Sequence, residues 1–294
     1  MVYRTERVDK QMTIRDNTII FGHSPDADDA FMFYAMEKKI VGIPGYTVGH
    51  HMEDIESLNL LAATGKLPVT AISAARYPEV AEHYQIMSCG SSVGRNYGPM
   101  VVSLAQMSET ELEGKRVAVP GRFTTSWLLF QIFGPTRCEP LFVDFDDAGP
   151  AVKDGRADIG ILLHEGQILY EKQGFHGVMN LGEKWFEATG LPIPLGVDLV
   201  SRHIGDELAQ QIANASLASI NYAREHEDEA LEYALSFGRG IDPDDGKKFV
   251  RMYVNDDTVD MGQEGRDALE KLFSMAVERG ILSDLPELDI LQAM

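Results

Sequence analysis

The sequence predicts an α/β fold with two lobes, and three patterns in the chain predict it. Short β-rich runs alternate with amphipathic helical segments along the earlier part of the chain. Two segments rich in glycine and proline, near 98–103 and 192–199, have the character of crossings between lobes, and consecutive helices follow the second one. We therefore expect a discontinuous first lobe, 16–98 with 200–294, and a second lobe over 104–191.

Each expected element follows from the period of its apolar residues. Short apolar runs predict strands over 18–21, 69–72, 85–88, 100–104, 116–119, 140–143 and 159–163. Ile55, Leu58 and Leu61 recur at spacings of three and four, which predicts an amphipathic helix over 54–64. The helices expected in the last part of the chain, separated by polar turns at 238–240 and 241–243, are 206–224, 225–237, 243–253 and 264–279.

The composition indicates an ordered protein that does not bind polyanions. With 294 residues, 44% of them hydrophobic, the chain can bury a full core. Lys and Arg total 26 against 46 Asp and Glu, and the net charge of −20 argues against nucleic acid and anionic membranes as partners. A small acidic ligand would therefore need a locally electropositive pocket. Residues 1–15 contain no apolar segment of signal-peptide length, and no later segment has the roughly 20 apolar residues of a membrane span, so we expect a cytoplasmic protein.

The cysteines and the acidic run indicate neither a disulfide framework nor a metal site. Cys89 and Cys138 lie far apart and lack C-x-x-C spacing, so we expect both to be small buried side chains. The acidic run that starts at Asp26 begins like an EF-hand, but Phe31 stands where that loop requires glycine. We expect no metal and interpret the carboxylates of this run as caps of a helix that begins near Asp29, with a looser metal site as the weaker alternative.

The run 114–127 combines a strand, a sharp turn and a helix start. Its apolar strand breaks at Pro120, and a helix then begins through Thr124, Thr125 and Ser126. The first N–H groups of a helix lack intrahelical partners and carry partial positive charge, so hydroxyl residues there can hold an anion such as a carboxylate. The competing interpretation is that the three hydroxyls only cap the helix.

A second apolar strand, 159–163, ends abruptly in His164, Glu165 and Gly166. Open α/β sheets place their ligands at the carboxyl ends of strands, so we expect His164 at the same site. A neutral imidazole can accept a proton near neutral pH, because its unperturbed pKa is about 6.5. The competing interpretation is a satisfied histidine at a strand end, although the glycine that follows favours a sharp exposed turn.

Several motifs together resemble a known enzyme family. In chain order they are SPDADDAFMFYAM, EDIESLNLLAATGKLPVTAIS, GRNYGP, VPGRFTTSW, LLHEGQILY, TGLPIPLG and VNDDTVDMGQEG. Their order and spacing are similar to those of the 1,4-dihydroxy-6-naphthoate synthases of the futalosine route to menaquinone, over nearly the whole chain after about residue 15. The resemblance implies a two-lobed type 2 periplasmic-binding-protein fold and a cytoplasmic carbon–carbon lyase that needs no cofactor.

The resemblance also implies which residues act. His164 is the implied general base, which takes a hydroxyl proton in a step like a retro-aldol cleavage. This step converts cyclic dehypoxanthinylfutalosine to 1,4-dihydroxy-6-naphthoate. The implied substrate-binding residues, to which we add the adjacent Thr124, are Ala71, Ile72, Ser73, Thr124, Thr125 and Ser126. Without the resemblance, Ser73 would be interpreted as a residue that bonds only to local backbone.

The chain departs from the family pattern at two places. The first loop of the family usually reads Ser-Pro-Cys-Pro-Asn-Asp-Thr, whereas this chain carries Asp26 and Asp28 within 24–30. If this loop contacts the negative end of the substrate, the two extra carboxylates weaken binding, which leaves a related but different ligand open. Phe123 also stands where the family has a histidine, so the site has one titratable group fewer.

Arg95, Arg122 and Tyr97 are further candidates for contact with a small carboxylate substrate. Each arginine lies in a glycine-containing turn beside the expected cleft, where it either binds a carboxylate bidentately or is a solvated surface charge. Tyr97 either stacks on an aromatic bicycle or packs in the core. Two alternative functions stay open: a small-carboxylate solute-binding protein of the same fold, and an enzyme similar to chorismate dehydratase. The sequence does not determine the oligomeric state.

Overall fold

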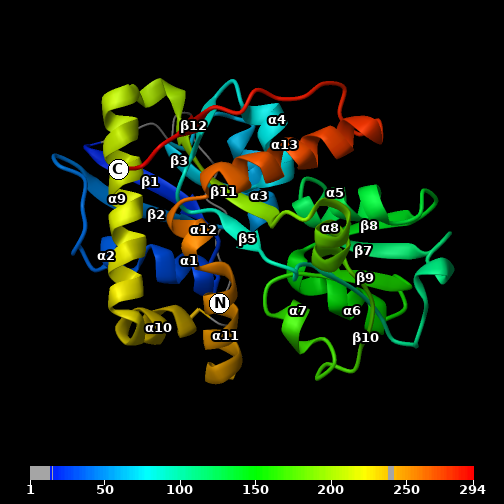
Figure 1. The fold of residues 1–294 in the computed structure, drawn as a ribbon. Helices are drawn as coiled ribbons and strands as arrows, with labels where there is room; N and C mark the ends of the chain where they lie inside the picture. Colours follow the sequence, from blue (N-terminus) through cyan, green and yellow to red (C-terminus); the bar gives the residue numbers. More distant parts are fainter. Residues whose placement is uncertain (1–13, 15, 238–241) are drawn as a thin grey trace.

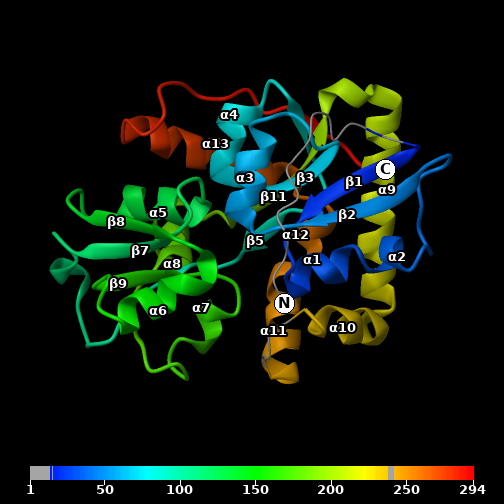
Figure 2. The ribbon, with the colours of Figure 1, turned by 180° about the vertical axis from the view of Figure 1, so that it is seen from behind.

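The computed structural model describes residue 14, residues 16–237 and residues 242–294. The turn expected at 238–240 and the segment 1–13 therefore lie outside the described residues. Two β-sheets form the centres of two lobes, which lie side by side in Figure 1 and are seen from behind in Figure 2. The predicted two-lobed α/β architecture is confirmed.

The first sheet has seven strands in the order β12-β4-β11-β3-β1-β2, and β5 also pairs with β11. Its strands are β1 (Thr18–His23), β2 (Thr47–Met52), β3 (Val69–Ser73), β4 (Tyr84–Met87), β5 (Ser92–Gly94), β11 (Ile193–Ser201) and β12 (Ile290–Leu291). Strands β2 and β3 run parallel to β1, while β11 runs antiparallel to β3 with Val197 opposite Ile72. All residues of β3 are buried, because this strand lies in the middle of the sheet.

The second sheet has five strands in the order β10-β6-β9-β7-β8. They are β6 (Met100–Ser103), β7 (Arg116–Pro120), β8 (Glu139–Val143), β9 (Ile159–Leu162) and β10 (His176–Asn180). Strand β7 is parallel to both β8 and β9, whereas β6 is antiparallel to β9 and β10. The carboxyl ends of β7 and β9 therefore meet at one edge of this sheet, where α5 and the turn after β9 begin.

Helices surround both sheets. Those of the first lobe are α1 (Ala27–Met32), α2 (Tyr34–Glu37), α3 (Ile55–Ala62), α4 (Tyr77–Val80), α9 (Asp206–Glu225), α10 (Glu227–Leu235), α11 (Pro243–Tyr253), α12 (Asp256–Val259) and α13 (Gly262–Glu278). Those of the second lobe are α5 (Thr125–Phe133), α6 (Ala148–Lys153), α7 (Gly166–Leu169) and α8 (Leu181–Thr189). The long α9 lies on the outer side of the first lobe, and α13 contacts both β11 and α5 (Figure 1).

The expected strands and helices are present, with small shifts at their ends. Each of the seven expected strands is found within one or two residues of its predicted ends. The helix expected over 54–64 is α3, which begins after Asp54 because this side chain accepts hydrogen bonds from the N–H groups of Glu56 and Ser57. Both thiols are free, and the expected burial is confirmed for Cys89 but wrong for Cys138, which is half-buried. None of the helices in the described part of the chain is long and apolar enough to cross a membrane.

The chain crosses between the two sheets twice. It leaves the first sheet after β5, through Gly98 and Pro99, and returns before β11, through Leu191 and Pro192. Most residues of the two predicted hinge segments belong instead to strands β6 and β11. From these two crossings we propose that the first lobe comprises 16–98 and 200–294 and that the second lobe comprises 104–191.

Candidate active site

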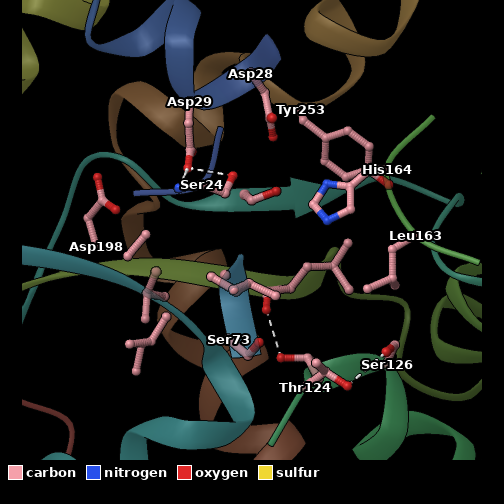
Figure 3. Close-up of a pocket in the computed structure, with 18 of the residues that line it drawn as sticks. Ser24, Asp28, Asp29, Ser73, Thr124, Ser126, Leu163, His164, Asp198 and Tyr253 are labelled. Carbon is pink, nitrogen blue, oxygen red and sulfur yellow. Dashed lines mark hydrogen bonds between the residues drawn. The ribbon is translucent and has the colours of Figure 1, made fainter. Parts of the chain in front are cut away.

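A pocket between the two lobes collects most of the residues that the sequence singled out. Seven of the nine predicted site residues line it, from the end of β3, the start of α5 and the turn after β9. The lining consists of Ser24, Asp28, Asp29, Ile55, Ala71, Ile72, Ser73, Gly90, Ser92, Thr124, Thr125, Ser126, Leu163, His164, Gln167, Leu195, Gly196, Val197, Asp198, Phe249 and Tyr253. Figure 3 shows Asp28 and Asp29 on one side of the cavity, Thr124 and Ser126 on the other, and His164 between them.

The hydroxyl end of the pocket is built by the start of α5. Thr124 is the N-cap of this helix, and its Oγ1 accepts a hydrogen bond from the N–H of Trp127 at 3.3 Å. The same hydroxyl lies 3.0 Å from Oγ of Ser126, and both side chains are buried. Thr124 therefore caps the helix and also lines the pocket. A carboxylate placed here would meet hydroxyls and the partial positive charge of a helix start.

Thr125 connects the two lobes through its hydroxyl. Its Oγ1 donates a hydrogen bond to the carbonyl of Leu195 at 2.7 Å and accepts one from the N–H of Ala75 at 3.1 Å. Ala75 belongs to the first lobe and Leu195 to strand β11 of the first sheet, whereas Thr125 belongs to the second lobe. Ser73 is held from within the first lobe, since Asn59 donates to its Oγ at 3.1 Å and accepts from its N–H at 2.9 Å. The hydroxyls of Thr125 and Ser73 thus already have protein partners.

Glu56 forms another connection between the lobes. Its carboxylate accepts hydrogen bonds from the backbone N–H of Arg122 at 2.7 Å and of Phe123 at 3.0 Å. The turn requires glycine at 121, because Gly121 has φ +99° and a Cβ there would lie 2.7 Å from the Glu56 carboxylate. The guanidinium of Arg76 also lies over the Phe123 ring at 3.9 Å. Several contacts of different chemistry therefore hold the lobes together around the pocket.

His164 lies in a strained turn at the edge of the pocket. Its φ is 49°, in the left-handed region that side chains other than glycine rarely adopt. The side chain is 20% exposed, and its Nδ1 lies 3.2 Å from Oδ2 of Asp26. The rings of Phe145 and Phe249 lie edge-on to the imidazole, with centroids 5.4 Å and 6.3 Å away. An imidazole held in this way, and still reachable from the pocket, is suited to proton transfer.

The acidic run does not cap a helix near Asp29, and that prediction is wrong. Helix α1 begins at Ala27, and the N-cap residue Asp26 makes no side-chain capping bond. Oδ2 of Asp29 instead accepts a hydrogen bond from the N–H of Ser24 at 2.6 Å. The Ser24 hydroxyl lies 2.8 Å from Oδ2 of Asp26 and 2.9 Å from Oδ2 of Asp29. These bonds turn both carboxylates back toward the loop and the cleft.

Burial makes charge unfavourable on the acidic residues of the pocket. It raises the pKa of Asp29 to about 6, and the neighbouring Asp26 carboxylate adds to the effect. Burial, followed by the proximity of Asp29, also holds the pKa values of Asp28 and Asp198 well above the usual range. Oδ1 of Asp28 is buried without a hydrogen-bond partner among the described residues. Protonated carboxyl groups at this end can donate hydrogen bonds to ligand hydroxyls or carbonyls.

Some lining residues were not found by the sequence analysis. Asp198 lies in β11 between Val197 and Leu199, and a single carboxylate inside an apolar strand is a signal that could have found it. Tyr253 donates a hydrogen bond from its hydroxyl to Oε1 of Gln167 at 2.6 Å, which joins α11 to α7 across the cleft. No local pattern marks Tyr253 or Gln167, because each fits an ordinary helix.

Arg95, Tyr97 and Arg122 lie outside the lining of this pocket. The guanidinium of Arg95 bonds bidentately to Asp257 at 2.7 and 2.8 Å, and also to Glu264 at 2.7 Å. The Tyr97 hydroxyl donates to a backbone carbonyl of α11, and the Arg122 guanidinium lies over an aromatic ring of β8. These contacts are structural ones between protein groups. They give no support to the prediction that Arg95 and Tyr97 bind substrate.

One group of side chains at the edge of the pocket has the composition of a metal site. One ligand atom from each of Asp26, Asp28 and His164 lies within 4.8 Å of the others. Carboxylate oxygens and imidazole nitrogens are ligands of several divalent cations. The contacts of Asp26 with His164 and Ser24 also account for its position through protein groups alone. The expectation that the site needs no metal stays a prediction.

Comparison with known proteins gives relatives for nearly the whole chain. A 1,4-dihydroxy-6-naphtoate synthase from Thermus thermophilus is 36% identical over 265 residues, which are 90% of this chain and 96% of that protein. A protein of the same name from Streptomyces coelicolor is 31% identical over 275 residues, 92% of this chain and 96% of that protein. The solved structure of a protein from Archaeoglobus fulgidus has 42% identity and a TM-score of 0.86, and the match covers 91% of this chain and 99% of that one.

More distant structures share the fold, and a family match covers most of the sequence. The alkanesulfonate-binding protein from Xanthomonas axonopodis has a TM-score of 0.68 at 12% identity, with 96% of this chain and 100% of that one covered. This likeness confirms the predicted periplasmic-binding-protein type of fold. A sequence model of the family described as Menaquinone biosynthesis matches residues 19–278. The chain therefore belongs to the menaquinone biosynthesis family.

Proposed function

We propose that this chain is a carbon–carbon lyase that converts cyclic dehypoxanthinylfutalosine to 1,4-dihydroxy-6-naphthoate. The observation that carries the proposal is the position of His164, which lies in the pocket between the lobes, between the acidic side and the hydroxyl end. The names of two relatives, at 36% and 31% identity over most of the chain, support it. We further propose a cytoplasmic location, as expected of a biosynthetic enzyme with a small carboxylate substrate.

In the proposed reaction His164 is the general base. Nε2 of the imidazole takes the proton of a substrate hydroxyl, and the electron pair of the O–H bond forms a carbonyl. The adjacent carbon–carbon bond breaks, and its electron pair passes into the conjugated ring system that becomes the naphthoate. The ribose-derived carbons leave with the new carbonyl group. The imidazolium then gives its proton to the ring-derived product. Because the electron pair of the broken bond stays on that product, the step needs no added oxidant or reductant.

The two ends of the pocket orient the substrate in this proposal. Thr124 and Ser126, with the first N–H groups of α5, hold the substrate carboxylate. The opposite orientation would place that carboxylate against Asp28 and Asp29, where burial already disfavours negative charge. The hydroxyl-bearing part of the substrate therefore lies at the acidic end, beside His164. The β3 residues Ala71, Ile72 and Ser73 also line the pocket.

The test compares the wild type with His164→Ala and His164→Asn. Asparagine tolerates the left-handed backbone of residue 164 better than alanine, so His164→Asn is the better-folded variant without a base. Each protein is incubated with cyclic dehypoxanthinylfutalosine, and naphthoate is followed by chromatography and mass spectrometry. Turnover by the wild type, lowered by about 10²- to 10⁴-fold in both variants, is the expected result.

Other outcomes separate the alternatives. Equal turnover by all three proteins would remove His164 from the chemistry while keeping the enzyme. Substrate binding without turnover in the wild type would contradict the lyase and favour a solute-binding protein. Loss of water from chorismate, offered as a second substrate, would favour an enzyme similar to chorismate dehydratase.

A further inference from the structure

Asp26 and His164 approach each other across the cleft. Asp26 precedes α1 in the first lobe, and His164 follows β9 in the second. Oδ2 of Asp26 lies 3.2 Å from Nδ1 of His164, a distance at which the two groups can share a hydrogen. The Asp26 side chain is only 3% exposed, and its Oδ2 also accepts a hydrogen bond from the Ser24 hydroxyl at 2.8 Å. The carboxylate is therefore held in place by its own lobe.

This contact determines which imidazole nitrogen is available to a ligand. A neutral imidazole carries its proton on one nitrogen and accepts with the other, and a hydrogen bond at one nitrogen selects the tautomer. A carboxylate beside Nδ1 favours the Nδ1–H form and leaves Nε2 as the acceptor. The edge-on rings of Phe145 and Phe249 limit rotation of the imidazole. The second lobe alone supplies no such carboxylate to Nδ1 among the contacts of the described residues.

We propose that Asp26 is a positioning residue for His164, which accepts the Nδ1–H bond, keeps Nε2 free for the substrate proton and stabilises the imidazolium that forms. This inference rests on the proposed function, because it assigns a partner to the proposed base. Since the two residues belong to different lobes, the pair is complete only when the lobes are in contact. Closure of the lobes then assembles the base as well as enclosing the substrate.

Other ionisable groups also face His164. Asp28 and Asp29 approach from α1, Tyr253 lines the pocket from α11, and Glu165 is the next residue in the chain. Burial holds the pKa of Asp28 well above its usual range and raises that of Asp29 to about 6. Asp29 can therefore contribute to the same region of a pH profile. For this reason the test includes a variant of Asp29.

The first experiment measures kcat and the pH profile of kcat/KM for Asp26→Asn. This substitution keeps the shape of the side chain and removes its charge. We expect kcat to fall by about 10- to 100-fold, with little change in KM because Asp26 does not line the pocket. We also expect the acid limb of the profile to move toward lower pH, because the imidazolium that forms during turnover loses an adjacent negative charge.

Matched variants make this result specific. Asp146→Asn removes an exposed carboxylate of the second lobe and is expected to leave kcat and the profile unchanged. Asp26→Ala removes both charge and acceptor, and is expected to lose at least as much activity as Asp26→Asn. A fall in kcat with an unmoved acid limb would show a merely structural role and overturn the proposal. An acid limb that moves only in Asp29→Asn would overturn it as well.

A second readout does not depend on turnover. Nitrogen-15 spectra of the histidine side chains, with the His164 signals assigned from His164→Asn, report which ring nitrogen carries the proton. We expect an Nδ1–H tautomer in the wild type and its loss in Asp26→Ala. An Nε2–H tautomer in the wild type would overturn the pairing even in an active enzyme. An inactive wild type whose Nδ1–H tautomer depends on Asp26 would contradict the proposed function and support the pairing.

Metal analysis of the purified protein completes the test. A divalent ion bound in stoichiometric amount, lost in Asp26→Asn and required for turnover, would overturn the proposal of direct contact between Asp26 and His164. A metal-free protein that keeps full activity in the presence of a chelator would support that contact.

Discussion

Removal of the Glu56 carboxylate is expected to weaken ligand binding without changing the lining of the pocket. Glu56 does not line the pocket, yet it accepts hydrogen bonds across the lobes from the N–H groups of Arg122 at 2.7 Å and Phe123 at 3.0 Å. A hydrogen bond to a charged group contributes about 1.5–3 kcal/mol. Because Glu56 is half-buried, water screens its charge, and we take about 1 kcal/mol for each bond. The two bonds then favour contact between the lobes by about 2 kcal/mol, a factor of about 30.

The assay compares Glu56→Ala with Glu82→Ala, a control in the first lobe whose side chain is 79% exposed. Calorimetric titration with 1,4-dihydroxy-6-naphthoate is expected to show affinity lowered by up to about 30-fold in Glu56→Ala and unchanged in the control. Small-angle X-ray scattering of the liganded protein is expected to give a larger radius of gyration for Glu56→Ala. An affinity within about twofold of the wild type would refute the reasoning that these bonds hold the lobes together.

Asp198→Asn is expected to raise the melting temperature more at about pH 8 than at about pH 4.5. Burial raises the pKa of Asp198, so as the pH rises the unfolded chain releases this proton before the folded protein does, and the stability of the wild type falls. Asparagine does not titrate, so the variant lacks this loss of stability. Equal shifts of the melting temperature at the two pH values, measured by calorimetry, would contradict this prediction. Thr125→Val leaves the Leu195 carbonyl without its hydroxyl donor and is expected to lower the free energy of unfolding in urea by about 1–3 kcal/mol, most of which Thr125→Ser should recover. Arg95→Ala is expected to lower that free energy by about 1 kcal/mol or less, because the guanidinium beside Asp257 is 53% exposed. A KM raised more than about tenfold in Arg95→Ala would instead indicate contact with substrate.

The sequence predicted most of the strands in the middle of each sheet and the edge strand β8, and it missed the edge strands β2, β10 and β12, the short β5 and the middle strand β11. Strands β3 and β9 are buried along their whole length, so each reads as a continuous apolar run. Strand β2 lies at an edge, is partly exposed and contains two histidines, and β12 has only two residues. Neither has a clear period, because pairing with a neighbour and not local composition makes it a strand. Strand β11 was interpreted as a crossing because of its prolines and glycine.

The same distinction applies to the site. Thr124 and His164 could be selected from local sequence because each stands where a helix begins or a strand ends, whereas Ser73 was assigned from the family resemblance. The contact of Asp26 with His164 could not, since it joins two lobes whose relative placement depends on the whole fold. Arg95 was predicted to bind substrate, but its guanidinium pairs with Asp257, which lies 162 residues away in the chain. No local pattern reveals such a distant partner.

The discontinuity of the first sheet sets an order of assembly during synthesis. All strands of the second sheet, β6 to β10, are made in one stretch over 100–180. The first sheet lacks β11, which separates β3 from β4, until residue 201 has been made. Domains generally fold as units while the chain emerges from the ribosome, so the second lobe folds first although most strands of the first lobe precede it. Until β11 has been made, the side of β3 opposite β1 has no partner strand, and such an exposed apolar edge can pair with another chain.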